Sequence, residues 1–99
     1  MKNFDKFHDF GYKGLYNGET ADDIAKRKGL RYREDILDNM GSTELSANLF
    51  RISQTEEKLR KDNIQTEQDA CKTHNKIGKI VRKAIKEVGR NYAREFTNS

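Results

Sequence analysis

Hydrophobic residues recur along the chain at helical spacing, and no segment alternates in the manner of a β-strand. The clearest pattern covers residues 67–88, where apolar positions three and four apart share one side of a helix. That side comprises Ile77, Ile80, Val81, Ala84, Ile85 and Val88. The chain is therefore predicted to be all-α, a small bundle of about five helices.

Capping and glycine signals divide the chain into these helices. Gly41 is expected to end one helix in the left-handed conformation, and Ser42 is expected to cap the next. The predicted helices cover residues 3–10, 20–28, 33–40, 43–61 and 66–88. Thr20 and Thr66 are expected to cap the second and fifth helices. Gly11, Gly29 and Gly89 are expected to end the first, second and fifth, and Asp62-Asn63 to break the fourth. The last two helices are expected to pack as a long antiparallel hairpin, covered on one side by the short helices. The chain is interpreted as a single helical domain over residues 1–99, with fraying over 1–10 and 90–99.

The predicted helix over 43–61 carries two different stripes. Its apolar positions share one face and are Leu45, Leu49, Ile52 and Leu59. A polar stripe that includes Asn48, Arg51 and Thr55 runs beside them. Asn and Thr are unfavourable in the middle of a solvated helix. The stripe therefore predicts a contact surface, either within the protein or with a partner or second copy.

Composition limits the core that this chain can build. Only 33% of its 99 residues are apolar, whereas 36% are charged. A core this lean favours a homodimer that buries more apolar surface, or ordering of part of the chain on binding. The single cysteine, Cys71, excludes an intrachain disulfide framework. No segment has the pattern of a signal peptide or membrane span, so a cytoplasmic location is expected.

The net charge of +4 is distributed unevenly. Residues 1–33 hold eight bases and five acids, residues 34–66 hold four and seven, and residues 67–99 hold eight and four. This basic, acidic and basic layout is typical of a polyanion-binding surface, and equally of head-to-tail self-association.

A row of bases on the last predicted helix is the strongest candidate for binding. It consists of Lys76, Lys79, Arg82, Lys83 and Lys86. Flexible cations in a row neutralise successive phosphates of a nucleic acid without reading its sequence. The same row also suits an acidic partner protein. The alternative is a solvated basic face with no ligand.

A second basic cluster lies around the turn after the second helix. It consists of Lys26, Arg27, Lys28 and Arg31. It suits a further phosphate patch, with Tyr12, Tyr16 and Tyr32 placed to stack on unpaired bases. The alternative is a solvated turn with tyrosines in the core. Residues 20–30 also resemble the start of a helix-turn-helix, but the acids in 33–40 would repel DNA phosphates.

Metal-binding and catalytic patterns are weak. Cys71 and His74 supply two neighbouring ligands, whereas structural zinc sites use four. The paired acids of the chain lack a nearby nucleophile or a phosphate-gripping loop. We therefore expect no metal, no cofactor and no catalytic residue, and a non-enzymatic function.

Several longer runs carry a family resemblance. They are Gly11-Tyr-Lys-Gly-Leu-Tyr16, Met40-Gly-Ser-Thr-Glu-Leu45, Asn48-Leu-Phe-Arg51, Gln54-Thr-Glu-Glu-Lys-Leu59, Thr73-His74, Gly78 and Val81-Arg82-Lys83. Together they resemble the C-terminal part of the DNA-damage-inducible protein D family over roughly residues 7–89. The chain is expected to be a free-standing version of that module, without the BRO-type N-terminal domain of longer family members.

The resemblance implies a regulatory or inhibitory protein that acts on DNA or on a DNA–protein complex. The family is associated with the SOS response and with antagonism of recombinase RecA. The expected partner is DNA, contacted through its backbone, or a DNA-bound protein. One alternative is a phage or mobile-element inhibitor that blocks a host nuclease or defence complex through protein–protein contact. Another is an oligomerisation or adaptor module.

Overall fold

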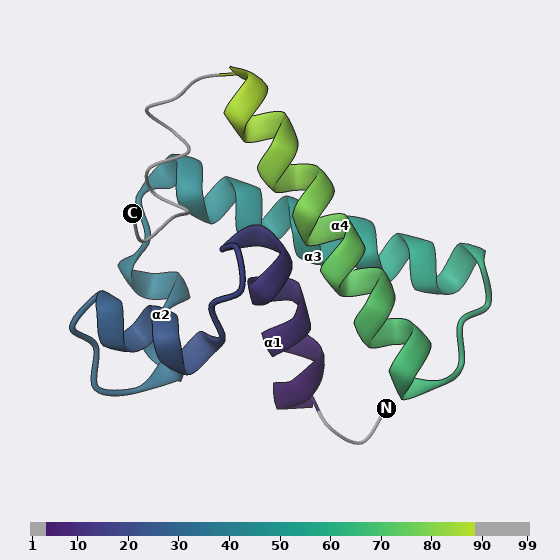
Figure 1. Ribbon diagram of the computed structural model, residues 1–99, viewed down its shortest axis with the longest axis horizontal. Helices are drawn as coiled ribbons and strands as arrows, with labels where there is room; N and C mark the ends of the chain where they lie inside the picture. Colours follow the sequence, from purple (N-terminus) through teal and green to yellow (C-terminus); the bar gives the residue numbers. More distant parts are fainter. Residues whose placement is uncertain (1–3, 89–99) are drawn as a thin grey trace.

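The computed structural model describes residues 4–88, and within that range the chain is helical with no strand (Figure 1). Its elements are α1 (Phe4–Leu15), α2 (Ala21–Arg27), the short 3₁₀ turns η1 (Arg33–Asp35) and η2 (Leu37–Asn39), α3 (Ser42–Lys61) and α4 (Glu67–Val88). The all-α prediction is confirmed. The expected five helices are four α-helices and two 3₁₀ turns over the described range.

Several predicted helix ends are confirmed by their hydrogen bonds. Thr20 Oγ1 accepts from the Asp23 amide at 3.2 Å, and the Asp23 carboxylate accepts from the Thr20 amide at 3.0 Å. This reciprocal pair starts α2. At the start of α4, Thr66 Oγ1 accepts from the Asp69 amide at 3.2 Å. Gly29, with φ +73°, follows α2 in the left-handed conformation.

Other predicted boundaries are wrong. α1 continues through Gly11, and residues 4–10 form its first turns rather than a frayed end. Gly41 has an extended backbone, with φ −67° and ψ 167°, and is itself the N-cap, so Ser42 is the first residue of α3. Two 3₁₀ turns replace the helix expected over 33–40. The segment that directly follows α2 therefore lacks the second α-helix of a helix-turn-helix. The expected stop at Gly89 and the fraying over 90–99 lie outside the described residues.

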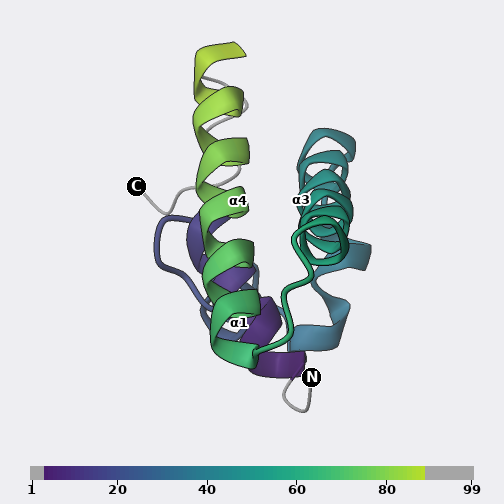
Figure 2. The same ribbon diagram turned by 90° about the vertical axis from the view of Figure 1, so that its right-hand side faces the viewer.

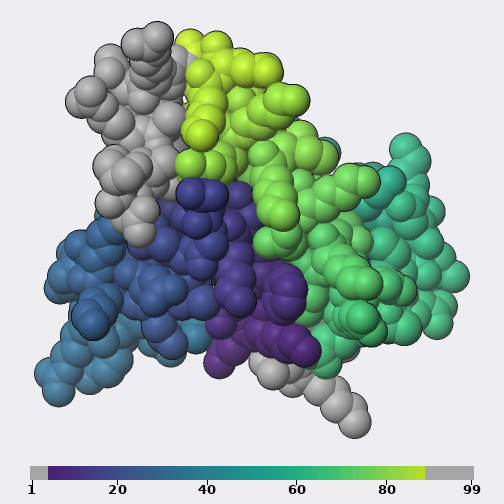
Figure 3. Space-filling view, in the orientation of Figure 1, coloured from purple at the N-terminus to yellow at the C-terminus, as the bar shows by residue number. Residues whose placement is uncertain are grey.

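The backbones of α1 and α4 touch where three glycines meet. A Cβ on Gly78 of α4 would lie 2.7 Å from the Gly11 carbonyl oxygen and 2.9 Å from the Leu15 amide nitrogen. A Cβ on Gly14 would overlap the Asn75 carbonyl oxygen. Only residues without a side chain permit this approach. Figure 3 shows the outcome, with α1 and α4 side by side along one face.

The helix that packs most closely along α4 is therefore α1. The antiparallel hairpin predicted for α3 and α4 differs from the observed arrangement. The two helices are joined by residues 62–66 and cross obliquely (Figure 1). Seen from the side, they separate toward the C-terminal end of α4 (Figure 2). This divergence leaves part of the apolar side of α4 without a neighbour.

The apolar core is small and lies where α1, α2 and η2 meet the long helices. Its fully buried members include Leu15, Tyr16, Ile24 and Ile36. A second, smaller cluster contains Phe7, Ala70 and Cys71. No helix among residues 4–88 is long and apolar enough to cross a membrane.

The glycine contact predicts the effect of Gly78→Ala. In an unconstrained helix this change is stabilising by up to about 1 kcal/mol. Here the added methyl group must push α1 away, so the free energy of unfolding should instead fall by about 1–3 kcal/mol. Urea unfolding followed by circular dichroism measures the change. Gly41→Ala is the control for the methyl group itself, because a Cβ there meets nothing within 4 Å; since Gly41 is the N-cap of α3, this change should cost only about 0.5–1 kcal/mol. A stabilised Gly78→Ala variant would show that the helices are not in backbone contact.

Candidate nucleic-acid interface

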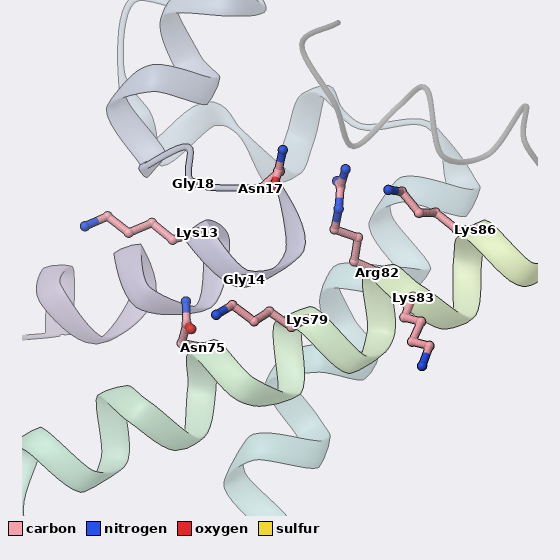
Figure 4. Close-up of a pocket in the computed structure, with 9 residues that line it drawn as sticks. All are labelled: Lys13, Gly14, Asn17, Gly18, Asn75, Lys79, Arg82, Lys83 and Lys86. Carbon is pink, nitrogen blue, oxygen red and sulfur yellow. The ribbon is translucent and has the colours of Figure 1, made fainter.

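A basic cleft lies between the C-terminal end of α1 and the C-terminal half of α4 (Figure 4). Its volume is about 560 Å³. Its lining consists of cations, amides and glycines, namely Lys13, Gly14, Asn17, Gly18, Asn75, Lys79, Arg82, Lys83 and Lys86. Within the described range, no carboxylate lines it. A concave surface with one sign of charge concentrates anions.

The end of α1 forms one wall of this basic cleft. Asn17 and Gly18 both have positive φ, at 57° and 101°, and the Gly18 amide donates to the Lys13 carbonyl at 2.7 Å. This hydrogen bond and the two positive φ angles turn the chain sharply after Leu15. Arg82 of α4 donates to the Leu15 carbonyl at 3.3 Å, and partial burial lowers its pKa. Asn75 donates to the Phe10 carbonyl at 3.0 Å. The two walls are thus joined by side chains of α4.

The lysines that α4 contributes to the basic cleft are exposed. Among the residues that the structure describes, Lys79, Lys83 and Lys86 form no ion pair. In Figure 4, Arg82, Lys86 and Asn17 point toward the same space, whereas Lys83 points away from it. Lys76 is exposed on α4 but does not line the cleft. The predicted row therefore divides into residues that face the cleft and residues on the outer side of α4.

The structure adds residues that the sequence pattern did not indicate. Lys13, Asn17 and Gly18 come from α1 and the turn after it, more than 50 residues before the lysines of α4. The available signal was Gly11, Gly14 and Gly78, because small residues on two helices permit close packing. Recognising that pair of helices would have placed Lys13 beside Lys79.

The second predicted cluster is partly neutralised by carboxylates. Arg27 forms an ion pair with Glu19 at 2.9 Å, and Lys28 forms one with Glu44 at 2.8 Å. Lys26 and Arg31 are exposed, and the Arg31 guanidinium lies 5.4 Å from the Tyr32 ring. Of the tyrosines expected to stack on bases, Tyr12 and Tyr16 are buried in the core and only Tyr32 is exposed. This cluster therefore stabilises the fold and offers fewer unpaired cations than the cleft does.

The polar stripe of α3 faces the interior of the same chain. Asn48, Arg51 and Thr55 are all completely buried. The expectation that this stripe contacts a partner or second copy is wrong, and the intramolecular alternative is confirmed. On the apolar face of α3, Leu49 is 52% exposed, whereas Leu45, Ile52 and Leu59 are half-buried.

These buried groups form one continuous network. The Tyr16 hydroxyl donates to Glu44 at 2.5 Å and accepts from Asn48 at 3.0 Å. The Asn48 side-chain oxygen accepts from Arg51 at 2.9 Å. Arg51 also donates to His74, and its guanidinium lies 4.7 Å from the Tyr12 ring centre. Because the side-chain contacts of Arg51 come from amide, imidazole and aromatic groups, its charge is stabilised without a direct carboxylate partner.

His74 must be neutral for the network to form. Its Nδ1 lies 2.9 Å from the Phe7 carbonyl oxygen and its Nε2 contacts Arg51. A proton on Nδ1 donates to Phe7, which leaves Nε2 free to accept from the guanidinium. Burial, and next the charge of Arg51, lower the pKa of His74 to about 3. Both ring nitrogens are used within the protein, so His74 is not available as a metal ligand.

The sequence of this chain matches a protein family and a curated protein. The family model described as the DinD C-terminal domain matches residues 1–97. DNA damage-inducible protein D of Escherichia coli (strain K12) is 52% identical over 83 residues, which cover 84% of this chain and 30% of that protein. The chain thus spans about a third of the length of this curated relative. No solved structure gives a significant match. These findings confirm the resemblance drawn from the sequence.

The neutral state of His74 predicts a pH dependence of stability. An unfolded histidine binds a proton below about pH 6.5, whereas folded His74 does so only near pH 3. Between these values the unfolded state holds more protons. The free energy of unfolding should therefore fall as the pH decreases, by up to about 1.4 kcal/mol per pH unit. Above about pH 6.5 both states hold a neutral His74, so this residue should cause no further change in stability.

Urea unfolding of the wild type and His74→Gln, measured between about pH 8 and pH 4, isolates this contribution. The difference in the free energy of unfolding between the wild type and His74→Gln should be constant at about pH 8 and should shrink as the pH approaches about 4. His8→Gln is the control, because His8 is only half-buried and should leave most of the slope in place. Parallel curves for the wild type and His74→Gln would contradict the proposed neutral imidazole.

Proposed function

The chain belongs to the DinD C-terminal domain family, and from this premise we propose that it acts in the DNA-damage response by binding the phosphate backbone of DNA. The DNA is either bare or part of a DNA–protein complex. The proposed action is occupancy of the backbone, without catalysis. The basic cleft between α1 and α4 is the contacting surface.

One observation carries this proposal: cations from two helices line the same cleft, and no carboxylate of the described residues lines it. Lys13 approaches from α1, and Lys79, Arg82 and Lys86 approach from α4. In the second cluster, by contrast, Arg27 and Lys28 are paired with carboxylates. Like charges that line one cleft repel one another, and an anion in the cleft would relieve this repulsion.

The chemistry of the lining suits phosphate better than base edges. Lysine and arginine supply charge-assisted hydrogen bonds to phosphate oxygens, and Asn17 and Asn75 supply amides beside them. No aromatic ring of the described residues lines the cleft, so stacking on bases is not part of the proposed contact. Binding is therefore expected to depend strongly on salt and weakly on sequence.

The finer expectations remain proposals. Antagonism of recombinase RecA within the SOS response is supported by the family resemblance alone. If it occurs, a backbone-occupying module offers a direct route, since it would compete for the phosphates that a filament covers. An acidic protein surface, on a host nuclease or defence complex for example, presents carboxylates to the same cations and is the competing target.

Fluorescence anisotropy with labelled single-stranded and duplex DNA across a salt series tests the proposal. Four contacting cations predict a slope of log affinity against log salt of about −3 to −4. Lys79→Gln combined with Lys86→Gln should make the slope shallower by about one for each lysine. The same pair should weaken binding about tenfold at low salt.

A matched variant separates the cleft from net charge. Lys26→Gln combined with Arg31→Gln removes two exposed positive charges from the second cluster and should leave the slope almost unchanged. Equal weakening by both double variants would assign binding to net charge rather than to the cleft. Absence of binding to either DNA at low salt would refute direct backbone contact and leave an acidic protein as the target.

A further inference from the structure

The exposed side of α3 carries no charge for more than three turns. Between Thr43 and Thr55 the two charged residues, Glu44 and Arg51, are both buried. Every other side chain that reaches the surface there is apolar or a neutral polar group, and Leu49 and Phe50 are more than half exposed. In a chain with 36% charged residues, this depletion is unusual. Loss of charge together with exposed aromatic residues characterises the centre of protein–protein interfaces.

An apolar groove adjoins this surface, between the N-terminal half of α3 and the C-terminal half of α4. It lies where the two helices separate in Figure 2. Ala47 and Val81 are buried in it, whereas Phe50 and Val88 are 56% and 76% exposed. Like the exposed side of α3, its lining contains no charged residue within the described range.

The same face carries both a large exposed aromatic side chain and a groove. Phe50 is a large exposed side chain on one side of the groove, and the small residues Ser46, Ala47 and Ala84 line the space beside it. A projecting aromatic ring and a hollow of small side chains thus occur on one surface. That combination suits a two-fold symmetric interface, in which each copy presents the same patch to the other.

We propose that two copies of this chain associate through the α3–α4 groove. The α3 helix of each copy lies in the groove of the other, with Phe50 inserted beside Ala47 and Ala84 of the second copy. The uncharged, apolar lining of the groove suits an uncharged occupant, and the exposed side of α3 is such a surface. The interface lies on a different side of α4 from the basic cleft, so the proposal does not depend on the proposed function.

Sedimentation equilibrium of the full chain, without DNA, tests this proposal. The wild type should shift with increasing concentration from 11.5 kDa to twice that mass. Phe50→Lys places a charge in the interface, and Ala84→Trp fills the hollow. Each should raise the dimer dissociation constant by about 30-fold or more. Both positions are exposed, so circular dichroism should show the helical content of the wild type.

Tyr32→Lys is the matched control, because Tyr32 is 54% exposed and lies outside the groove. It should leave the dissociation constant unchanged. A wild type that stays monomeric over the whole soluble concentration range would overturn the proposal. So would a dimer that both groove variants leave intact, since its interface would then lie elsewhere. An equal loss of dimer in Tyr32→Lys would likewise refute a specific α3–α4 interface.

Discussion

The contact between the backbones of α1 and α4 is the constraint on which the other features depend. Gly11, Gly14 and Gly78 remove the side chains that would hold the helices apart. At this short separation His74 reaches the Phe7 carbonyl, and Arg82 reaches the carbonyl of Leu15. The same approach brings Lys13 of α1 opposite the lysines of α4. A wider separation would remove both the buried network and the basic cleft.

The buried network explains why a helix with a good apolar stripe turns its polar stripe inward. Arg51 is a fully buried cation, which is costly unless hydrogen bonds and an aromatic face replace water. Asn48, neutral His74 and the Tyr12 ring supply these contacts. The helix can adopt this orientation only because partners come from α1 and α4 together. Such a network has strict geometric requirements, and it favours one arrangement of the three helices over others.

Signals from neighbouring residues predicted most helix boundaries. Features that depend on contacts between distant parts of the chain were not predicted. The Thr20 and Thr66 caps and the break at Asp62-Asn63 depend on neighbouring residues, so α2, α3 and α4 were placed nearly correctly. Gly11 was interpreted as a helix stop because a lone glycine gives the same local signal as one that packs against another helix. The orientation of α3 was missed for a related reason. Periodicity identifies two faces, but which face is buried depends on Arg51 finding partners more than 20 residues away. The bases of α4 were found, whereas the opposite wall of the cleft was not.

The uncharged outer side of α3 follows from the burial of its polar stripe in the interior. With Arg51, Asn48 and Thr55 directed inward, the outer side of α3 between Thr43 and Thr55 has only apolar and neutral polar residues. A monomer gains nothing from exposing them, because exposed Phe and Leu side chains forgo the stabilisation of burial. A second copy would cover them while leaving the basic cleft open on another side of α4. Two clefts in one assembly would bind the same polyanion with a higher effective concentration than either alone. The burial of the polar stripe of α3 therefore links the folding of the single chain to the two contacts proposed for it, with DNA and with a second copy.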